Sequence, residues 1–423
     1  MFYDFIKRLT HLWNLSFFII LSVLLSIISG GCDNTSSSSN NYTPDSGSDV
    51  DAQDISDSDI VEDDFTCSES STELPRFIDL PGADPNGIYD PDLEWDPVNK
   101  ILWMVYSTVD GLPGSGKVST HLSFSEDNGT TWCHAGIINQ STDVPYDEQP
   151  ADIAQEQAHW SHETPSIYYD VDAPPQYRWT IIWHRYLHVE DNNADTDDRH
   201  FEHGWIARKS APSPWELADA TEEKLFSYLA YHFNPVIEAY NNSAPGGLPL
   251  KRFDTDPNLG GCIALGEPGV AVTDGKIIIA LFCYRSEEQQ DIVLINYSHE
   301  SELWSYSGTL LTTEDAQAIH PALTGFNAPD IYKTQTTWRM VISPADGLYH
   351  GCIEYEIDLE NAVLSDNDDN GPDVFYVYEQ NPDSQVFQTG ACTYHSESLT
   401  GMIAGDIYLS GVQFRLVATG DFR

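Results

Sequence analysis

Two neighbouring stretches of the chain, Tyr89-Asp90-Pro91-Asp92-Leu93 and Ile101-Leu102-Trp103-Met104-Val105-Tyr106, carry the pattern that decides the fold. The polar turn Asp96-Pro97-Val98-Asn99-Lys100 lies between them. The second stretch is rich in aliphatic and aromatic residues, as β-strands are. Strand, turn and strand together predict a β-hairpin.

The same pattern recurs four more times along the chain. The later copies open at residues 162–167, 266–272, 327–332 and 404–409, and each is followed by an aromatic or β-branched run. We call the opening of each copy its entrance. A proline lies at the entrance of the first four copies, and Gly405 lies at the corresponding position of the fifth. Aligned on this position, successive copies start 74, 103, 61 and 76 residues apart.

Hairpins at such intervals predict radial repetition. Five copies give about 70 residues per repeat, which fits a four-stranded blade with long loops. We therefore expect an all-β, five-bladed β-propeller over residues 75–423. A six-bladed, sialidase-like propeller is the nearest alternative, and the irregular spacing leaves a jelly roll or stacked β-sandwiches open.

The N-terminal region has the features of an export signal. Lys7 and Arg8 precede an apolar run that ends in Ser29-Gly30-Gly31-Cys32. Cys after Gly-Gly resembles a bacterial lipobox, which implies that residues 1–32 are a lipoprotein signal peptide and that Cys32 carries the lipid. An ordinary signal peptide and an uncleaved anchor are the alternatives. All three place the rest of the chain outside the cytoplasm, and the lipoprotein signal predicts a lipid-anchored protein of the bacterial cell envelope.

The charge is strongly negative throughout. The chain has 19 Lys and Arg against 67 Asp and Glu, a net charge of −48. Residues 33–74 contain twelve acidic residues and no Lys or Arg, which predicts a disordered acidic linker. Without this linker and the signal region, residues 75–423 still carry −37. Such a surface argues against a nucleic-acid partner, and a salty habitat or a cationic ligand would explain it.

Six cysteines follow Cys32, namely Cys67, Cys133, Cys262, Cys283, Cys352 and Cys392. An even number outside the cytoplasm predicts disulfides, with fifteen possible connectivities. Cys262 and Cys283 flank two short strand-like runs, so we expect them to pair. No Cys or His spacing is typical of a zinc site.

One further motif marks the fold. Ser125, Asp127, Gly129 and Trp132 match the Asp-box pattern S-x-D-x-G-x-x-W of sialidase-like propellers. In this motif the Asp side chain caps backbone amides of a tight turn and the Trp packs beneath the hairpin. We interpret it as a structural feature on outer strands and not as evidence of sialidase activity.

The entrances concentrate carboxylic acids. In a propeller they converge on the central axis, so the acids should share one pocket and have divergent pKa values. Glycoside hydrolysis needs such a split between a neutral acid and a carboxylate. The acids in question are Asp90, Asp92, Glu163, Glu267, Asp330 and Asp406.

The Tyr-Asp-Pro-Asp and Gly-Glu-Pro entrances, with the repeated Pro-x-aliphatic starts, resemble the five-bladed glycosidases of glycoside hydrolase family 43 and their invertase-like relatives. The resemblance implies inverting hydrolysis with Asp90 as general base and Glu267 as general acid. An Asp in the second blade tunes the pair in that family. Here Glu163 is the nearest match, although it lies two residues before Pro165, and His162 is an alternative. Asp92 is an alternative to Asp90.

Other polar and aromatic residues near the entrances are candidate substrate contacts, with interblade packing as the alternative for the tryptophan. These candidates are Asp92, His162, Trp183, Arg185, Asp330 and Asp406. We expect no required cofactor. Asp366, Asp368 and Asn370 match the first half of a calcium loop, but Val377 replaces its final glutamate, so a solvated acidic turn is the alternative.

Two functions follow from these observations. The first is a surface-anchored glycoside hydrolase that acts on a polysaccharide and meets the membrane only through its lipid. The second is a non-catalytic propeller lipoprotein that binds glycans or proteins. An envelope assembly protein without a pocket is a third. The sequence does not predict the sugar, its anomer, exo or endo action, or the oligomeric state.

Overall fold

The computed structural model describes residues 65–83, 87–109, 117–145, 157–189, 199–227, 251–253, 256–286, 288–298, 303–365, 374–378, 386–408 and 413–420. Within these ranges no helix is long and apolar enough to cross a membrane. The predicted signal peptide, Cys32, most of the predicted linker and the predicted calcium ligands Asp366, Asp368 and Asn370 lie outside them.

Five β-sheets make up the described structure, and each is one blade. Blade 1 consists of β2 (Ile88–Asp96), β3 (Ile101–Val109), β4 (Val118–Ser125) and β5 (Cys133–Asn139). Blade 2 consists of β6 (Thr142–Asp143), β7 (Ala158–Tyr169), β8 (Trp179–Val189), β9 (Arg199–Ala211), β10 (Glu223–Ser227) and β11 (Lys251–Arg252). Blade 3 consists of β12 (Ala264–Thr273), β13 (Lys276–Ser286), β14 (Gln289–Ser298) and β15 (Leu303–Leu311).

Blade 4 consists of β16 (Gly325–Lys333), β17 (Trp338–Ala345), β18 (Cys352–Asp358), β19 (Val363–Leu364) and β20 (Val374–Tyr378). Blade 5 consists of β21 (Val386–Thr393), β22 (Ile403–Tyr408), β23 (Gln413–Ala418) and β1 (Arg76–Ile78). The described helices are short: α4 (Thr313–Ile319) and the 3-10 turns η1 (Pro175–Tyr177) and η2 (Pro214–Glu216).

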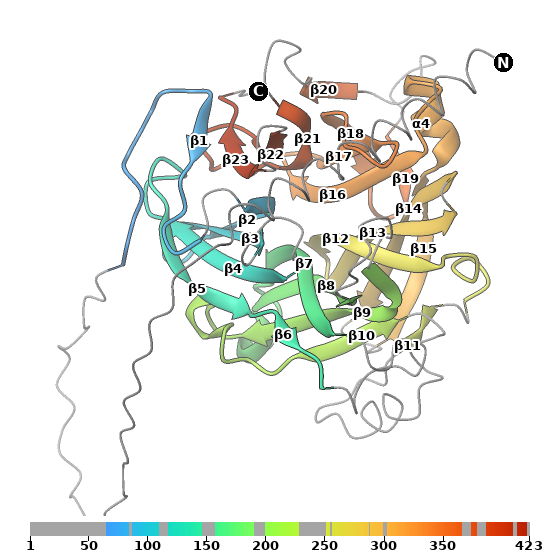
Figure 1. The fold of residues 1–423 in the computed structure, drawn as a ribbon, viewed down its shortest axis with the longest axis horizontal. Coiled ribbons are helices and arrows are strands. Elements are labelled where there is room, and N and C mark those ends of the chain that lie inside the picture. The colour runs from blue at the N-terminus through green and yellow to red at the C-terminus, as the bar shows by residue number, and fades with distance from the viewer. Residues whose placement is uncertain are drawn as a thin grey trace, which may run out of the picture. The chain divides into compact units, whose positions relative to one another are not determined.

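The blades form a closed ring (Figure 1). Strand β2 contacts β7, β7 contacts β12, β12 contacts β16, β16 contacts β21, and β21 contacts β2 again. These five strands are therefore the innermost strands around one axis. The expected five-bladed β-propeller is confirmed, and the six-bladed, jelly-roll and sandwich alternatives are wrong.

The N-terminal end of the described domain closes the ring twice. Strand β1 pairs antiparallel with β23 and completes blade 5. Just before it, the Ser68 amide donates to the Trp132 carbonyl oxygen at 2.7 Å, and Cys67 is bonded to Cys133 of blade 1. One chain segment thus joins the last blade to the first.

Each innermost strand contains a β-bulge at the same place. The register of the ladder breaks there in all five strands, and one residue in each break has a φ of 49° or 50°. We call these five the bulge residues: Asp90, Thr164, Glu267, Ala328 and Ala391. Proline follows the bulge residue in blades 1 to 4, and Cys392 follows it in blade 5.

The fifth entrance was wrongly predicted. Residues 404–409 were expected to open the fifth copy, but they overlap β22, which is the second strand of blade 5. The innermost strand of that blade is β21. It escaped the pattern because Cys392 stands where the other entrances have proline.

A separate hydrophobic core fills each gap between neighbouring blades. Trp103 and Trp183 belong to the core between blades 1 and 2, and both are fully buried. Trp132 is fully buried between blades 5 and 1. Burial of such large side chains contributes roughly 2–3 kcal/mol each, so these tryptophans stabilise the ring.

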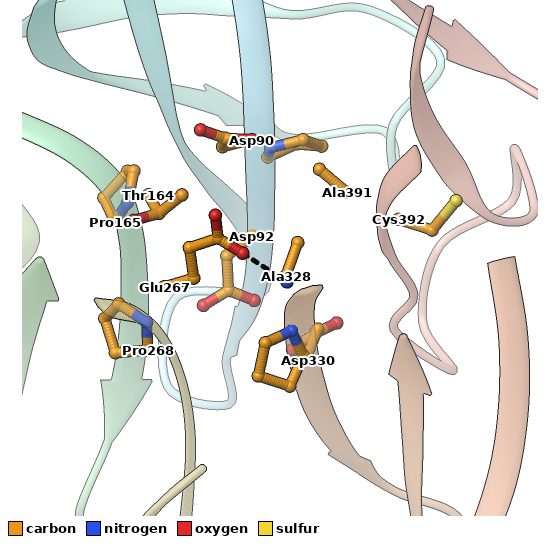
Figure 2. Close-up of a pocket in the computed structure, with 12 residues that line it drawn as sticks. Asp90, Asp92, Thr164, Pro165, Glu267, Pro268, Ala328, Asp330, Ala391 and Cys392 are labelled. Carbon is orange, nitrogen blue, oxygen red and sulfur yellow. Dashed lines mark hydrogen bonds between the residues drawn. The ribbon is translucent and has the colours of Figure 1, made fainter. Parts of the chain in front are cut away.

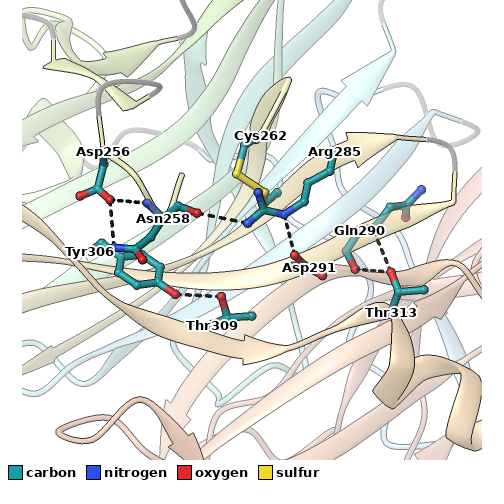
Figure 3. The surroundings of a disulfide bond; sticks show 10 residues. Asp256, Asn258, Cys262, Arg285, Gln290, Asp291, Tyr306, Thr309 and Thr313 are labelled. Atoms are coloured by element: carbon teal, nitrogen blue, oxygen red, sulfur yellow. Dashed lines mark hydrogen bonds and ion pairs between the residues drawn. A yellow bond between two sulfur atoms is a disulfide. The ribbon is translucent and has the colours of Figure 1, made fainter. Parts of the chain in front are cut away.

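All six cysteines beyond Cys32 are paired. The bonds are Cys67–Cys133, Cys262–Cys283 and Cys352–Cys392. The predicted Cys262–Cys283 bond is confirmed, and Figure 3 shows Arg285 beside it, donating to the Asp291 carboxylate at 2.7 Å and to the Asn258 carbonyl oxygen at 3.2 Å. The Cys352–Cys392 bond joins β18 of blade 4 to β21, the inner strand of blade 5.

The Asp-box residues lie in the turn between β4 and β5. Ser125 Oγ donates to Asp127 at 2.8 Å and accepts from the Gly129 amide at 2.7 Å. Asp127 also accepts from the Thr131 amide at 2.7 Å. These bonds fix the turn on the outer half of blade 1, and none of its residues lines the axial pocket described next.

Candidate active site

The entrances of all five blades meet at one pocket on the axis (Figure 2). The empty space between its lining residues, open solvent included, is about 300 Å³. The lining consists of the five bulge residues, the residues that follow them, and two aspartates one position further on: Asp90, Pro91, Asp92, Thr164, Pro165, Glu267, Pro268, Ala328, Pro329, Asp330, Ala391 and Cys392. Residues as far apart in the sequence as Asp90 and Cys392 therefore share one wall.

Asp90 is the bulge residue of blade 1 and is only 7% exposed. Its carboxylate accepts from Ser107 Oγ at 3.4 Å. Burial, followed by the negative charges of Glu163 and Glu267, raises the pKa of Asp90 well above its ordinary range. The neutral, protonated form of Asp90 is therefore favoured.

Glu267 is the bulge residue of blade 3, and its carboxylate is held by blade 4. The Ala328 amide donates to Glu267 Oε2 at 2.6 Å. The Tyr349 hydroxyl, from the segment between β17 and β18, donates to Oε1 at 3.5 Å. Donors of this kind stabilise the ionised form of a carboxyl group.

A second pair of acids, Asp92 on β2 and Asp330 on β16, lies two positions beyond the bulge residues of these strands. The two carboxyls hydrogen-bond to each other across the axis, which requires that they share a proton. The Ile167 amide donates to Asp92 at 2.7 Å, and the Tyr394 amide donates to Asp330 at 3.3 Å. Burial raises the pKa of both carboxyls, and the charge of Asp92 raises that of Asp330 further.

Blade 2 presents Thr164, not Glu163, at the bulge position. Thr164 is 7% exposed, and its hydroxyl has no hydrogen-bond partner in the structure. Glu163 precedes it and lies outside the pocket lining. Its two oxygens accept from the Tyr89 hydroxyl at 3.0 Å and the Tyr186 hydroxyl at 2.8 Å.

Four predicted substrate contacts lie away from the pocket lining. His162 and Trp183 are buried, and the Trp183 indole N–H donates to His162 Nδ1 at 3.0 Å. The reason is the alternation of strand residues, which turns both side chains from the axis toward the core between blades. Asp406 is on β22, where it accepts from Thr389 Oγ1 at 2.6 Å.

Arg185 is the fourth. Its guanidinium lies 4.6 Å from the centre of the Trp160 ring and 4.6 Å from that of Trp205, and it donates to Glu222 at 2.7 Å. This arrangement engages both its charge and its planar faces within blade 2. The two other predicted contacts, Asp92 and Asp330, do line the pocket.

Some pocket residues were missed by the sequence analysis. Thr164, Ala328 and Ala391 carry no chemistry that would single them out, and Tyr349 comes from a segment outside the repeat. Only the position directly before proline would have identified Thr164 and Ala328. In the described part of the chain, no three His, Cys, Asp or Glu side chains are grouped to hold a metal ion.

Fold and site together define a class: a five-bladed β-propeller with a pocket of carboxylic acids on its axis. No protein-family model and no curated protein matches the sequence. Among solved structures, similar folds belong to glycosidases of families GH32 and GH43.

One is the GH32 beta-fructofuranosidase of Bombyx mori, with a TM-score of 0.44 and 12% identity over 79% of this chain and 61% of that chain. Another is the glycoside hydrolase family 32 protein of Bifidobacterium adolescentis, with a TM-score of 0.46 and 11% identity over 81% and 57%. A third is the Bacillus subtilis arabinanase, with a TM-score of 0.42 and 11% identity over 79% and 95%. This chain thus spans about three fifths of the two GH32 proteins, and the likeness is one of fold.

Proposed function

We propose that this protein is a glycoside hydrolase that acts on a saccharide in the axial pocket. One observation carries the proposal. Asp90 and Glu267 occupy the same bulge position in blades 1 and 3, line the same pocket, and lie close enough for their charges to interact. Two carboxyls with different protonation states in one cavity are the minimum that acid/base cleavage of a glycosidic bond needs.

The reaction follows from these two groups. The protonated carboxyl gives its proton to the glycosidic oxygen as the bond from that oxygen to the anomeric carbon breaks. The carboxylate takes a proton from a water molecule whose oxygen attacks the anomeric carbon from the opposite side. The products are two free hydroxyl-bearing sugars, with inversion at the anomeric carbon.

The environments of the two carboxyls favour Asp90 as the acid and Glu267 as the base. Asp90 is buried among negative charges, which favours its neutral form, whereas the Ala328 amide and Tyr349 hydroxyl favour the ionised form of Glu267. This assignment is the reverse of the one that the resemblance to family 43 implied.

Leaving-group chemistry tests both the function and the assignment. We would measure turnover of a panel of oligosaccharides and of the matching dinitrophenyl glycosides by wild type, Asp90→Asn and Glu267→Gln. Loss of a general acid costs roughly 10²–10⁴-fold. A dinitrophenyl group leaves without protonation, so Asp90→Asn should lose oligosaccharide cleavage and keep most aryl glycoside cleavage.

Glu267→Gln should lose both, and azide should restore part of its aryl glycoside cleavage by replacing the activated water. Glu288→Gln, which removes one exposed charge from blade 3, is the matched control and should behave as wild type. The opposite pattern would restore the roles implied by the resemblance. Equal turnover by all four proteins, or none by wild type on any glycoside, would contradict hydrolysis in this pocket.

A non-catalytic glycan-binding propeller is the second candidate. The observation that favours it is Thr164, which stands where the resemblance implies a tuning aspartate in blade 2. Saturable glycan binding that Glu267→Gln weakens, without turnover of any glycoside by wild type, would support this alternative.

We further propose that the domain is held at the cell surface by lipid on Cys32. Support comes from the sequence of residues 1–32 and from three disulfides, which are typical of oxidising compartments outside the cytoplasm. Palmitate labelling of wild type and Cys32→Ala is the test. Equal labelling and equal membrane fractionation of the two proteins would rule the anchor out.

A further inference from the structure

The wall of the axial pocket carries charge of one sign. Its twelve lining residues include four carboxylic acids and no Lys, Arg or His. The charges that act on Asp90 are those of Glu163 and Glu267, and no cation is among them. A narrow pocket of this kind focuses a negative potential, so it favours a positively charged ligand and disfavours an anionic one.

The two pairs of acids lie at different positions along the inner strands. Asp90 and Glu267 are bulge residues of blades 1 and 3, and Asp92 and Asp330 lie two positions beyond the bulge residues of blades 1 and 4 (Figure 2). All four line the same pocket. A group with several donors in this cavity would therefore face carboxyl oxygens on more than one side.

Thr164 supplies an independent sign of a ligand. Thr164 lines the pocket and is more than nine-tenths buried, and its buried hydroxyl has no hydrogen-bond partner. An unpaired buried hydroxyl costs free energy unless something in the cavity bonds to it. It lies at the blade 2 position equivalent to Asp90 and Glu267, so a ligand between these two acids is within its reach.

We propose that the pocket selects a saccharide unit that carries a protonated primary amine, as units of glucosamine or galactosamine do. An ammonium group has three donors and a positive charge, which match the surrounding carboxyl oxygens and the Thr164 hydroxyl. A neutral hydroxyl at the same carbon has one donor and no charge. The saccharide part of this inference rests on the proposed function, and it names the substrate class of the same pocket.

A metal ion fits the pocket less well than an ammonium group. The described residues contain no group of three metal-ligating side chains. An organic cation that donates hydrogen bonds remains the better match.

The experiment compares methyl glycosides that differ only at carbon 2. Both anomers of methyl glucosaminide, methyl N-acetylglucosaminide and methyl glucoside would be titrated calorimetrically into the full chain at about pH 6, where the amine is protonated. We expect the amine to bind at least about tenfold more tightly than the other two, because a hydrogen bond between charged groups is stronger than a neutral one.

Two isosteric variants and one control locate the effect. Thr164→Val removes the hydroxyl, and Asp330→Asn removes a carboxyl while it keeps an amide in its place. Each should reduce the preference for the amine about tenfold, and Glu288→Gln on the surface of blade 3 should not change it. Circular dichroism of each variant would show that the fold is kept. Competition with calcium chloride would show whether a metal ion occupies the pocket instead.

Equal affinity for the three glycosides, no binding of any of them, or displacement of the amine by calcium in the micromolar range would overturn the inference. Its failure is distinguishable from that of the proposed function. Hydrolysis of neutral glycosides without preference for the amine would refute the inference and leave the hydrolase intact. Preferential binding of the amine without turnover of any glycoside would support the inference and refute the hydrolase.

Discussion

The Cys67–Cys133 disulfide offers a quantitative test of how the ring is closed. The bond spans 66 positions in sequence and joins the segment before β1 to β5, so it links the closing strand of blade 5 to blade 1. In the chain-entropy description, a loop of that length stabilises the folded state by about 4 kcal/mol. The corresponding value for Cys262–Cys283, which spans 21 positions, is about 3 kcal/mol.

The double variant Cys67→Ala/Cys133→Ala is well suited to this measurement, because Cys67 is exposed and Cys133 is half-buried. Little packing is lost with the sulfur atoms, so the change in the free energy of unfolding should be close to the loop value of about 4 kcal/mol. Urea denaturation would measure it. Hydrogen exchange should become faster in β1 and β23 and stay unchanged in β13.

Cys262→Ala/Cys283→Ala provides the comparison. Both of these cysteines are buried, with 1% and 0% exposure, so this variant should lose more than its loop value because a packing defect is added. A loss below about 1 kcal/mol for the Cys67 and Cys133 variant, with unchanged exchange in β23, would refute the view that this bond holds the ring shut.

Three other outcomes are expected. Gly269→Ala should destabilise the fold by about 1–3 kcal/mol in thermal unfolding, because a Cβ there would collide with the Pro329 carbonyl oxygen of blade 4; an unchanged Tm would contradict that contact. Asp330→Asn should be more stable than wild type at about pH 8 and lose this advantage toward about pH 4 in urea titrations, because burial raises the pKa of Asp330 and wild type loses stability as the pH rises above the unfolded value of about 3.9. A pH-independent difference would show that Asp330 is not protonated in the folded state. Ser125→Ala should cost about 1 kcal/mol by removing the bond from the Gly129 amide, without an effect on glycoside turnover; a fall in turnover would tie the β4–β5 turn to the pocket.

Much of the fold could be predicted from the sequence because proline recurs where the chain enters four of the five blades. A proline follows the bulge residue in each of these blades, namely Pro91, Pro165, Pro268 and Pro329. A strand that contains aromatic residues comes after each proline, beyond one hairpin turn. The fifth blade could not be found this way. Its inner strand has Cys392 at that place, and the pattern moved instead to β22, the next strand.

The site was predicted less completely. The repeat locates each blade in the sequence, but it does not show which residue of the inner strand occupies the bulge position. Asp90 and Glu267 directly precede proline, so their equivalence was visible in the sequence. Glu163 and Asp330 were aligned with them by residue type alone. The bulge places Thr164 and Ala328 at the equivalent positions, since the backbone conformation and not the side chain defines them.

The side chains removed from the pocket have two physical causes. A bulge shifts the alternation of a strand by one residue, so a pattern read along the sequence assigns some side chains to the wrong face, as for His162 on β7. Trp183 and Arg185 are on β8, the second strand of blade 2, which does not line the pocket. Tyr349 escaped prediction differently, because its contact with Glu267 depends on how blade 4 packs beside blade 3.

The cysteine that replaces proline at the fifth entrance gives the protein a maturation requirement. In four blades, the proline ring that shapes the mouth of the cavity is present as soon as the chain is synthesised. The remaining blade depends on a bond from Cys352 that forms only by oxidation. A chain without this bond therefore has an incompletely braced mouth, and the finished shape of the cavity requires oxidising conditions.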